Sequence, residues 1–200
     1  MYGYTICEYN KVKENFPEYK SIMETLRTKL VAMAAADWAP KTFGGMAPKA
    51  GQFGESTIMP ELFRSCSTGT AATATLTTWN QWLDTTGNNT IMSGSNVGTT
   101  YEDYKIGLAG IALLDKATRI SEIRMQIADR KIPRINIEEA LCYKQTAIVF
   151  EQPFIVDEES GFDLYAYVTN AGPARIKLLG LQLNRVPNKL QTSNCMAALT

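Results

Sequence analysis

Hydrophobic and polar side chains alternate through much of the second half of the chain, from residue 119 to residue 185. In the segment 162–169, for example, Phe162 and Leu164 are separated by Asp163, and the alternation continues to the end of the segment. A period of two places successive side chains on opposite faces of a strand, so this region predicts half-buried antiparallel strands. The predicted strands are, in chain order, 72–78, 89–93, 104–113, 120–128, 131–137, 146–151, 153–156, 162–169 and 175–184.

These strands predict a mainly β fold. After residue 100 no helical pattern separates one predicted strand from the next, and parallel pairing would require such crossover connections. Because each strand has one apolar face, we expect two antiparallel sheets closed on each other as a β-sandwich. The alternation slips by one residue at Leu178-Leu179, and again between Ile120 and Ile123, and each slip predicts a β-bulge.

A helical arm is predicted ahead of the sandwich. It begins near Pro17, whose fixed φ suits the first helical turn, and ends at Asp37-Trp38-Ala39-Pro40. Its apolar residues recur at spacings of three and four and form one stripe. Two interpretations stay open: the helix packs on its own domain, or it is an arm that packs on a neighbouring subunit. In the second case the interface candidates are Ile22, Leu26, Leu30, Met33 and Trp38.

The predicted division of the chain has three parts. Residues 1–65 are an extended segment, the helix and a glycine-rich linker, residues 66–187 are the sandwich, and residues 188–200 are a surface tail.

The composition narrows the possible functions. Twenty basic and twenty acidic residues cancel and are spread evenly, which argues against strong binding to nucleic acid. There is no histidine, so nucleophile systems that need one are excluded within one chain, and we predict that the protein is not an enzyme and has no cofactor. The four cysteines lie far apart, either as free thiols or in one of three disulfide pairings: Cys7, Cys66, Cys142 and Cys195.

The chain also lacks targeting signals that the sequence would reveal. No basic start precedes an apolar run at the N-terminus, and no apolar stretch approaches the ~20 residues that span a bilayer. We therefore expect a protein that works where it is made or that leaves by a route without a cleavable signal.

Two groups in the strand region are candidate sites. Four carboxylates fall within seven residues, and hard oxygen ligands of this kind can hold calcium, although acidic turns are usually only solvated. They are Asp157, Glu158, Glu159 and Asp163. Tyr165 and Tyr167 lie on the polar side of an alternating strand and suggest a contact surface between subunits.

Two tryptophans stand close together at Trp79 and Trp82, beside a loop rich in Asn and Thr. They are either a stacking platform for a sugar or a base, or part of a core or subunit interface.

A family resemblance enters with residues 154–164. An apolar strand meets the acidic turn Asp157-Glu158-Glu159-Ser160-Gly161, and an alternating strand follows. This stretch resembles a late hairpin of viral jelly-roll proteins, and the Asn-Ala-Gly-Pro turn with the long apolar strand after it fits the end of such a roll. The resemblance covers residues 70–185.

The resemblance implies a structural protein similar to the small capsid, decoration or tail proteins of phages and archaeal viruses. Such a protein assembles with copies of itself and with other virion proteins, in a particle built in the host cytoplasm. It implies no catalytic residue and no small-molecule ligand. The alternative function is a carbohydrate-binding or adhesive surface module that uses Trp79 and Trp82.

Overall fold

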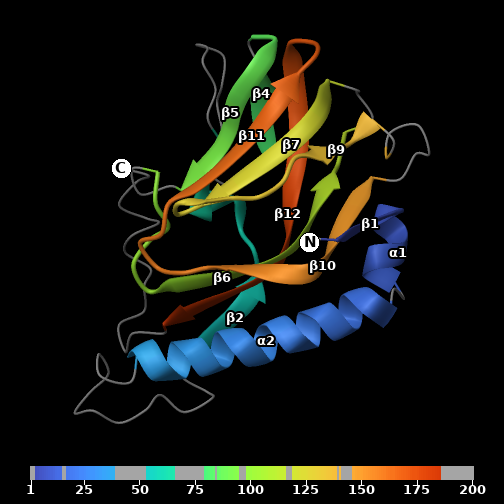
Figure 1. Cartoon of the computed structure of the whole chain (residues 1–200). Helices are drawn as coiled ribbons and strands as arrows, with labels where there is room; N and C mark the ends of the chain where they lie inside the picture. The colour runs from blue at the N-terminus through green and yellow to red at the C-terminus, as the bar shows by residue number, and fades with distance from the viewer. Residues whose placement is uncertain are drawn as a thin grey trace.

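The structure is a computed structural model of the whole chain, shown in Figure 1. It describes residues 3–14, 17–38, 53–65, 79–83, 85–94, 98–115, 119–138, 140 and 146–185. The predicted strand at 72–78, most of the predicted linker and the predicted tail at 188–200 lie outside these residues.

The first of two sheets has the strand order β1-β10-β6-β12-β2, and β4 pairs with the beginning of β12. Every pairing within it is antiparallel. The strands are β1 (Tyr4–Cys7), β2 (Phe53–Thr57), β4 (Asn80–Leu83), β6 (Tyr104–Leu113), β10 (Ala147–Val156) and β12 (Gly172–Arg185).

The second sheet has the order β3-β5-β11-β7-β8, with β9 also paired to β7. It too is antiparallel throughout. Its strands are β3 (Phe63–Ser65), β5 (Gly87–Gly94), β7 (Ile120–Ile127), β8 (Arg130–Lys131), β9 (Ile135–Asn136) and β11 (Phe162–Val168), and the short 3-10 helix η3 (Pro60–Leu62) precedes β3.

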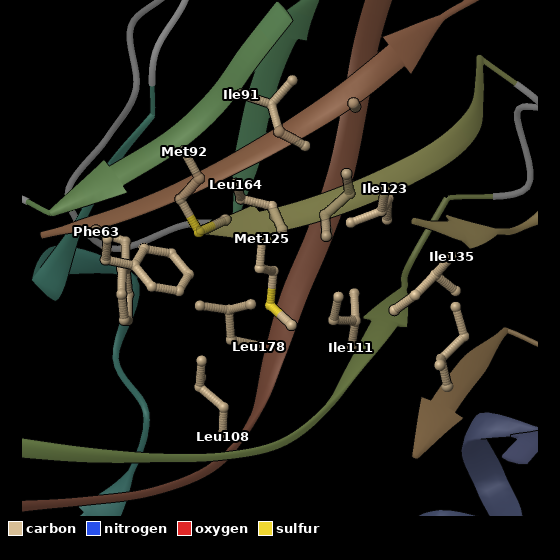
Figure 2. Packing of buried hydrophobic residues seen from close by; sticks show 14 of the residues in the cluster. Phe63, Ile91, Met92, Leu108, Ile111, Ile123, Met125, Ile135, Leu164 and Leu178 are labelled. Atoms are coloured by element: carbon tan, nitrogen blue, oxygen red, sulfur yellow. The ribbon is translucent and has the colours of Figure 1, made fainter. Parts of the chain in front are cut away.

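The main hydrophobic core lies between the two sheets. Figure 2 shows side chains of the first sheet meeting side chains of the second. Buried members include Leu108, Ile111 and Leu178 from the first sheet, and Met92, Ile123, Met125 and Leu164 from the second. The mainly β, antiparallel sandwich that the sequence predicts is therefore confirmed.

Two helices cover the outer face of the first sheet. They are α1 (Tyr9–Glu14) and α2 (Pro17–Trp38), and α2 runs across β6, β12 and β2 (Figure 1). Leu26, Leu30 and Ala34 of α2 are fully buried against this sheet. As a result the first sheet is apolar on both faces, whereas no helix in the described part of the chain covers the outer face of the second sheet.

Several predicted elements agree closely with the structure. The long helix spans Pro17–Trp38, and the predicted strand 104–113 is β6. The predicted strand 131–137 is instead two short strands, β8 and β9, on either side of Pro133. Proline has no backbone N–H for a sheet hydrogen bond, and this accounts for the break.

The predicted linker needs a correction, because residues 53–65 contain β2 and β3. These strands pair with β12 and β5, so the sandwich begins well before residue 66. The glycines of this region had predicted irregular chain. At Gly54 a Cβ atom would lie 2.1 Å from Oδ1 of Asn184, so this glycine allows close packing within the sheet instead. The N-terminal segment that the sequence predicts to be extended contains one short strand, β1, and then helix α1.

Both predicted bulge regions contain a shift of register. In β7 the pairing passes from Glu122 opposite Tyr167 to Ile120 opposite Val168, which leaves Ser121 as the extra residue. Between Leu179 and Gly180 of β12 the pairing passes from Gly110 to Leu108, so the extra residue is Ala109 of β6 and the bulge lies in the partner strand.

The apparent slip of alternation at Leu178-Leu179 has a different cause. Leu178 lies in the core between the sheets, and Leu179 packs with the cluster under the helices. Consecutive apolar residues occur here because this sheet is covered on both faces.

The two strands of the predicted late hairpin do not pair with each other. β10 pairs with β1 and β6, whereas β11 pairs with β5 and β7 in the other sheet. The acidic turn after β10 therefore carries the chain from one sheet to the other and does not join paired neighbours.

Candidate functional site

The interface candidates on α2 turn inward. Leu26, Leu30 and Trp38 have no exposed surface, and Ile22 and Met33 are half-buried. The interpretation in which the helix packs on its own domain is confirmed. The prediction that Leu26, Leu30 and Trp38 contact a neighbouring subunit is wrong, because the first sheet of the same chain already covers them.

Trp79 belongs to the core and not to a ligand platform. Its side chain is 8% exposed, and its ring stacks on Phe63 with 6.5 Å between the centroids. The platform prediction is therefore wrong for this residue, since a buried ring offers no face to a ligand. Trp82 lies in β4 opposite Pro173, and its side chain is outside the described part of the structure.

The acidic turn after β10 is occupied by contacts within the protein. Asp157 forms an ion pair with Lys105. Oε2 of Glu158 accepts hydrogen bonds from Nε1 of Trp38 and from the backbone N–H of Asp103, both at 3.1 Å. These contacts direct the two carboxylates toward α2 and β6.

The other two predicted calcium ligands do not join them. Glu159 is exposed at the tip of the turn, and Asp163 accepts a hydrogen bond from the Tyr165 hydroxyl at 3.4 Å. Within the described residues, no three His, Cys, Asp or Glu side chains are grouped closely enough to hold a metal ion. The structure thus gives no support to the calcium prediction.

The outer face of the second sheet carries the candidate functional surface, which we call the open face. On it, side chains of β7 and β11 lie directly opposite one another across the strand pair: Gln126 with Asp163, Arg124 with Tyr165, and Glu122 with Tyr167. The opposite sides of both strands supply the core, because Leu164 and Met125 point between the sheets. The alternation read from the sequence is what places these six residues on one surface.

Charges and rings on the open face are paired within it. The guanidinium carbon of Arg124 lies 4.8 Å from the centroid of the Tyr165 ring, a cation–π contact. Arg134 pairs with Glu122 at 3.4 Å. Partial burial, followed by the nearby charge of Asp163, raises the pKa of the Tyr165 hydroxyl. Tyr167 is 43% exposed, one of the most exposed large apolar side chains of the described structure.

This arrangement suits contact with another protein. Aromatic residues and arginine are enriched in protein interfaces, and tyrosine offers a large, rigid contact area. On the open face the acidic side chains of Glu122 and Asp163 alternate with basic ones, so it presents no strong field of either sign. The basic residues are Arg124, Arg134 and Lys131, which lies opposite Gln126. The sequence did not identify Arg124 as a candidate interface residue, because its contact with Tyr165 forms only when β7 and β11 are neighbours.

A small cavity lies between β6, β7 and β12. Its volume is about 20 Å³, room for one water molecule, and Arg119, Ile120, Ile137 and Ile176 are among the residues that line it. Nε of Arg119 is buried without a hydrogen-bond partner. The cavity has room for one water molecule and is too small for a substrate.

Comparisons with protein families, with curated proteins and with solved structures found no match for this chain. The class of protein must therefore be argued from the fold and its surfaces. None of the helices in the described residues has the length and apolar character needed to cross a membrane.

Proposed function

We propose that the sandwich is a jelly roll and that the protein is a structural subunit of a virus particle. The order of the strands carries this proposal. Eight strands in chain order are β2, β5, β6, β7, β9, β10, β11 and β12, and they divide into the sheets β2-β12-β6-β10 and β5-β11-β7-β9. The first strand thus neighbours the eighth, and the second neighbours the seventh. The third also neighbours the sixth, and the fourth neighbours the fifth, as two interlocked Greek keys require.

The jelly roll is the architecture of many viral capsid domains, although lectins and cupins use it as well. A cupin or a lectin needs a cavity or an exposed ligand platform. In the described structure the acidic turn is engaged in ion pairs and hydrogen bonds, and Trp79 is buried. What this sandwich offers outward is the open face, so a role in assembly fits better than a role in binding small molecules.

The partner we propose for the open face is a second copy of the chain or another protein of the particle. The mixture of acidic and basic groups on this face favours a protein surface over nucleic acid. The side chains of Arg124 and Tyr165 are already held against each other, so little side-chain freedom is lost on contact. The proposed location of the protein is the virion.

The test is the state of association of the purified full chain, measured by light scattering over a range of concentrations and by electron microscopy. We expect closed particles or symmetric oligomers whose fraction rises with protein concentration. A chain that stays monomeric at every concentration and in every buffer would count decisively against the proposal.

A matched pair of variants locates the contact. Tyr167→Ala removes a ring that is 43% exposed on the open face, and Tyr101→Ala removes one that is 41% exposed elsewhere. We expect the first variant to weaken association about tenfold or more and the second to leave it unchanged, because interface aromatics often contribute most of the binding energy. Equal effects of the two variants would exclude the open face as the contact surface.

A further inference from the structure

Lys105 stands out because it is a charged side chain with no exposed surface. Of the buried polar residues in the described structure it alone carries a charge. It precedes Ile106, which pairs with Val156 of the neighbouring strand, so Lys105 lies across from Asp157 at the end of β10. Its alkyl chain continues the apolar strand β6, while its amino group points to the side of the sheet that α2 covers.

The amino group of Lys105 joins three parts of the fold. Nζ contacts Asp157 of the acidic turn and lies 2.7 Å from Oδ2 of Asp37, in the last turn of α2. It also lies 5.6 Å from the ring centroid of Trp38, the last residue of the helix. Burial opposes the charge on Lys105, but the hydrogen bonds that its amino group donates to Asp157 and Asp37 outweigh this effect and raise its pKa.

The same turn of α2 is held by a second set of polar contacts. Trp38 donates from Nε1 to Glu158, and Glu158 also accepts from the backbone of Asp103. Asp103 in turn pairs with Arg185, at the end of β12, at 2.8 Å. One end of the helix is thus connected through charged and polar groups to β6, to the acidic turn and to β12.

The middle of the helix is held differently. Leu26 and Leu30 are buried, and Leu26 packs over Gly107 with only the glycine backbone beneath it. Hydrophobic packing of this kind is not directional and does not by itself fix how the end of a helix sits. The ion pair between Asp37 and Lys105 fixes the position of this end of the helix.

We propose that Lys105, Asp37 and Asp157 form an ionic latch that holds the C-terminal end of α2 on the first sheet, and that this end opens while the sandwich stays folded. A buried ion pair contributes little net stability, because desolvation offsets the attraction, but removal of one partner is costly because the other charge stays buried. The side chains of Asp37 and Asp157 are 45% and 43% exposed, so water already reaches both carboxylates and only the Lys105 side chain is buried. The core between the sheets contains no residue of α2 and can persist without this end.

Opening of the latch would uncover a defined apolar surface. Trp38 packs on Phe53 of β2, with 5.6 Å between the ring centroids, and shares one cluster with Ala109 and Leu183. This strip lies on the opposite side of the sandwich from the open face, so the latch is independent of the proposed assembly contact.

Native-state hydrogen exchange, read by mass spectrometry on peptides of the full chain, tests the latch. We expect Asp37→Asn to speed exchange in the last two turns of α2 about tenfold, since it removes a charge-assisted hydrogen bond, and to leave β7 and β11 unchanged. The control is Glu24→Gln, an exposed carboxylate on the same helix, which should change nothing. Placed in a Lys105→Met background, Asp37→Asn should have no further effect, because its partner is gone.

Three results would overturn the latch. Asp37→Asn could leave the exchange of α2 as it was, or it could speed exchange in β7 and β11 as much as in α2, which would mean that helix and sandwich open as one unit. An effect of Asp37→Asn that persists in the Lys105→Met background would show that Asp37 acts through another group.

Discussion

The side chain of Leu26 on α2 lies directly over Gly107 of β6, so closely that a Cβ atom on residue 107 would be 2.5 Å from Leu26 Cδ1. The helix can approach the sheet only because this position has no side chain. We therefore predict that Gly107→Ala destabilises the protein by about 1–3 kcal/mol through overpacking, measured by urea denaturation.

A double-mutant cycle tests this contact. Leu26→Ala alone should cost about 2–5 kcal/mol, because it leaves a cavity at a fully buried position. Combined with Gly107→Ala it should cost clearly less than the sum of the two changes, since each methyl group would then have room. Additive effects would mean that the two residues do not constrain each other.

A second glycine prediction concerns Gly180 in β12. Its φ is +151°, and a Cβ atom there would lie 1.9 Å from the backbone oxygen of Gly107. That oxygen belongs to the neighbouring strand and cannot move aside, so Gly180→Ala should destabilise the fold by more than about 2 kcal/mol or prevent folding. Gly98 is the matched control, with φ of +87° and open space around the Cβ position. There the same change should cost only about 1 kcal/mol from backbone strain, and equal losses of thermal stability would contradict this explanation.

A third prediction separates a core role from a binding role at Trp79. We expect Trp79→Ala to lower the free energy of unfolding by about 3–5 kcal/mol, because the ring packs on Phe63 inside the main cluster. Trp79→Phe should recover most of that loss. A Trp79→Ala variant with unchanged denaturant midpoint would show that the ring is not part of the core.

A fourth prediction follows from Tyr19 of α2. Burial, and then the neighbouring Tyr9, raise the pKa of its hydroxyl to about 12. The unfolded chain ionises near pH 10, so the stability that the neutral hydroxyl contributes is fully present below pH 10 and is lost as pH rises to about 12.

Tyr19→Phe should reduce this alkaline loss of stability, measured as the urea midpoint at neutral pH and at several values up to pH 12. Part of the loss should remain, because the pKa values of Lys105 and Tyr165 are raised as well and act in the same direction. Tyr101→Phe, on an exposed ring, is the control. A steeper loss in Tyr19→Phe than in the unmodified chain would contradict the assignment.

Periodicity located α2, β7 and β11 because each of these elements has a repeat long enough to read along the chain. β6 has no such repeat, and its two glycines and the turn after it indicated a strand. It failed at β2 and β3, which are short and contain residues such as Gly54 that signal a loop. It also failed at Trp79, because an aromatic residue beside a polar loop looks the same in sequence whether the ring is buried or exposed. The six residues of the open face were readable strand by strand, but the contact of Arg124 with Tyr165 was not.

The sequence by itself determined that this protein is a mainly antiparallel β protein with a long N-terminal helix, because a period of two and a period near 3.6 are local properties of a chain. Only the tertiary structure decided which strands are neighbours, that α2 covers the first sheet, and that Lys105 meets Asp37 and Asp157. Those relationships join residues far apart in the chain, and they are fixed by the joint burial of many side chains, which no local pattern records.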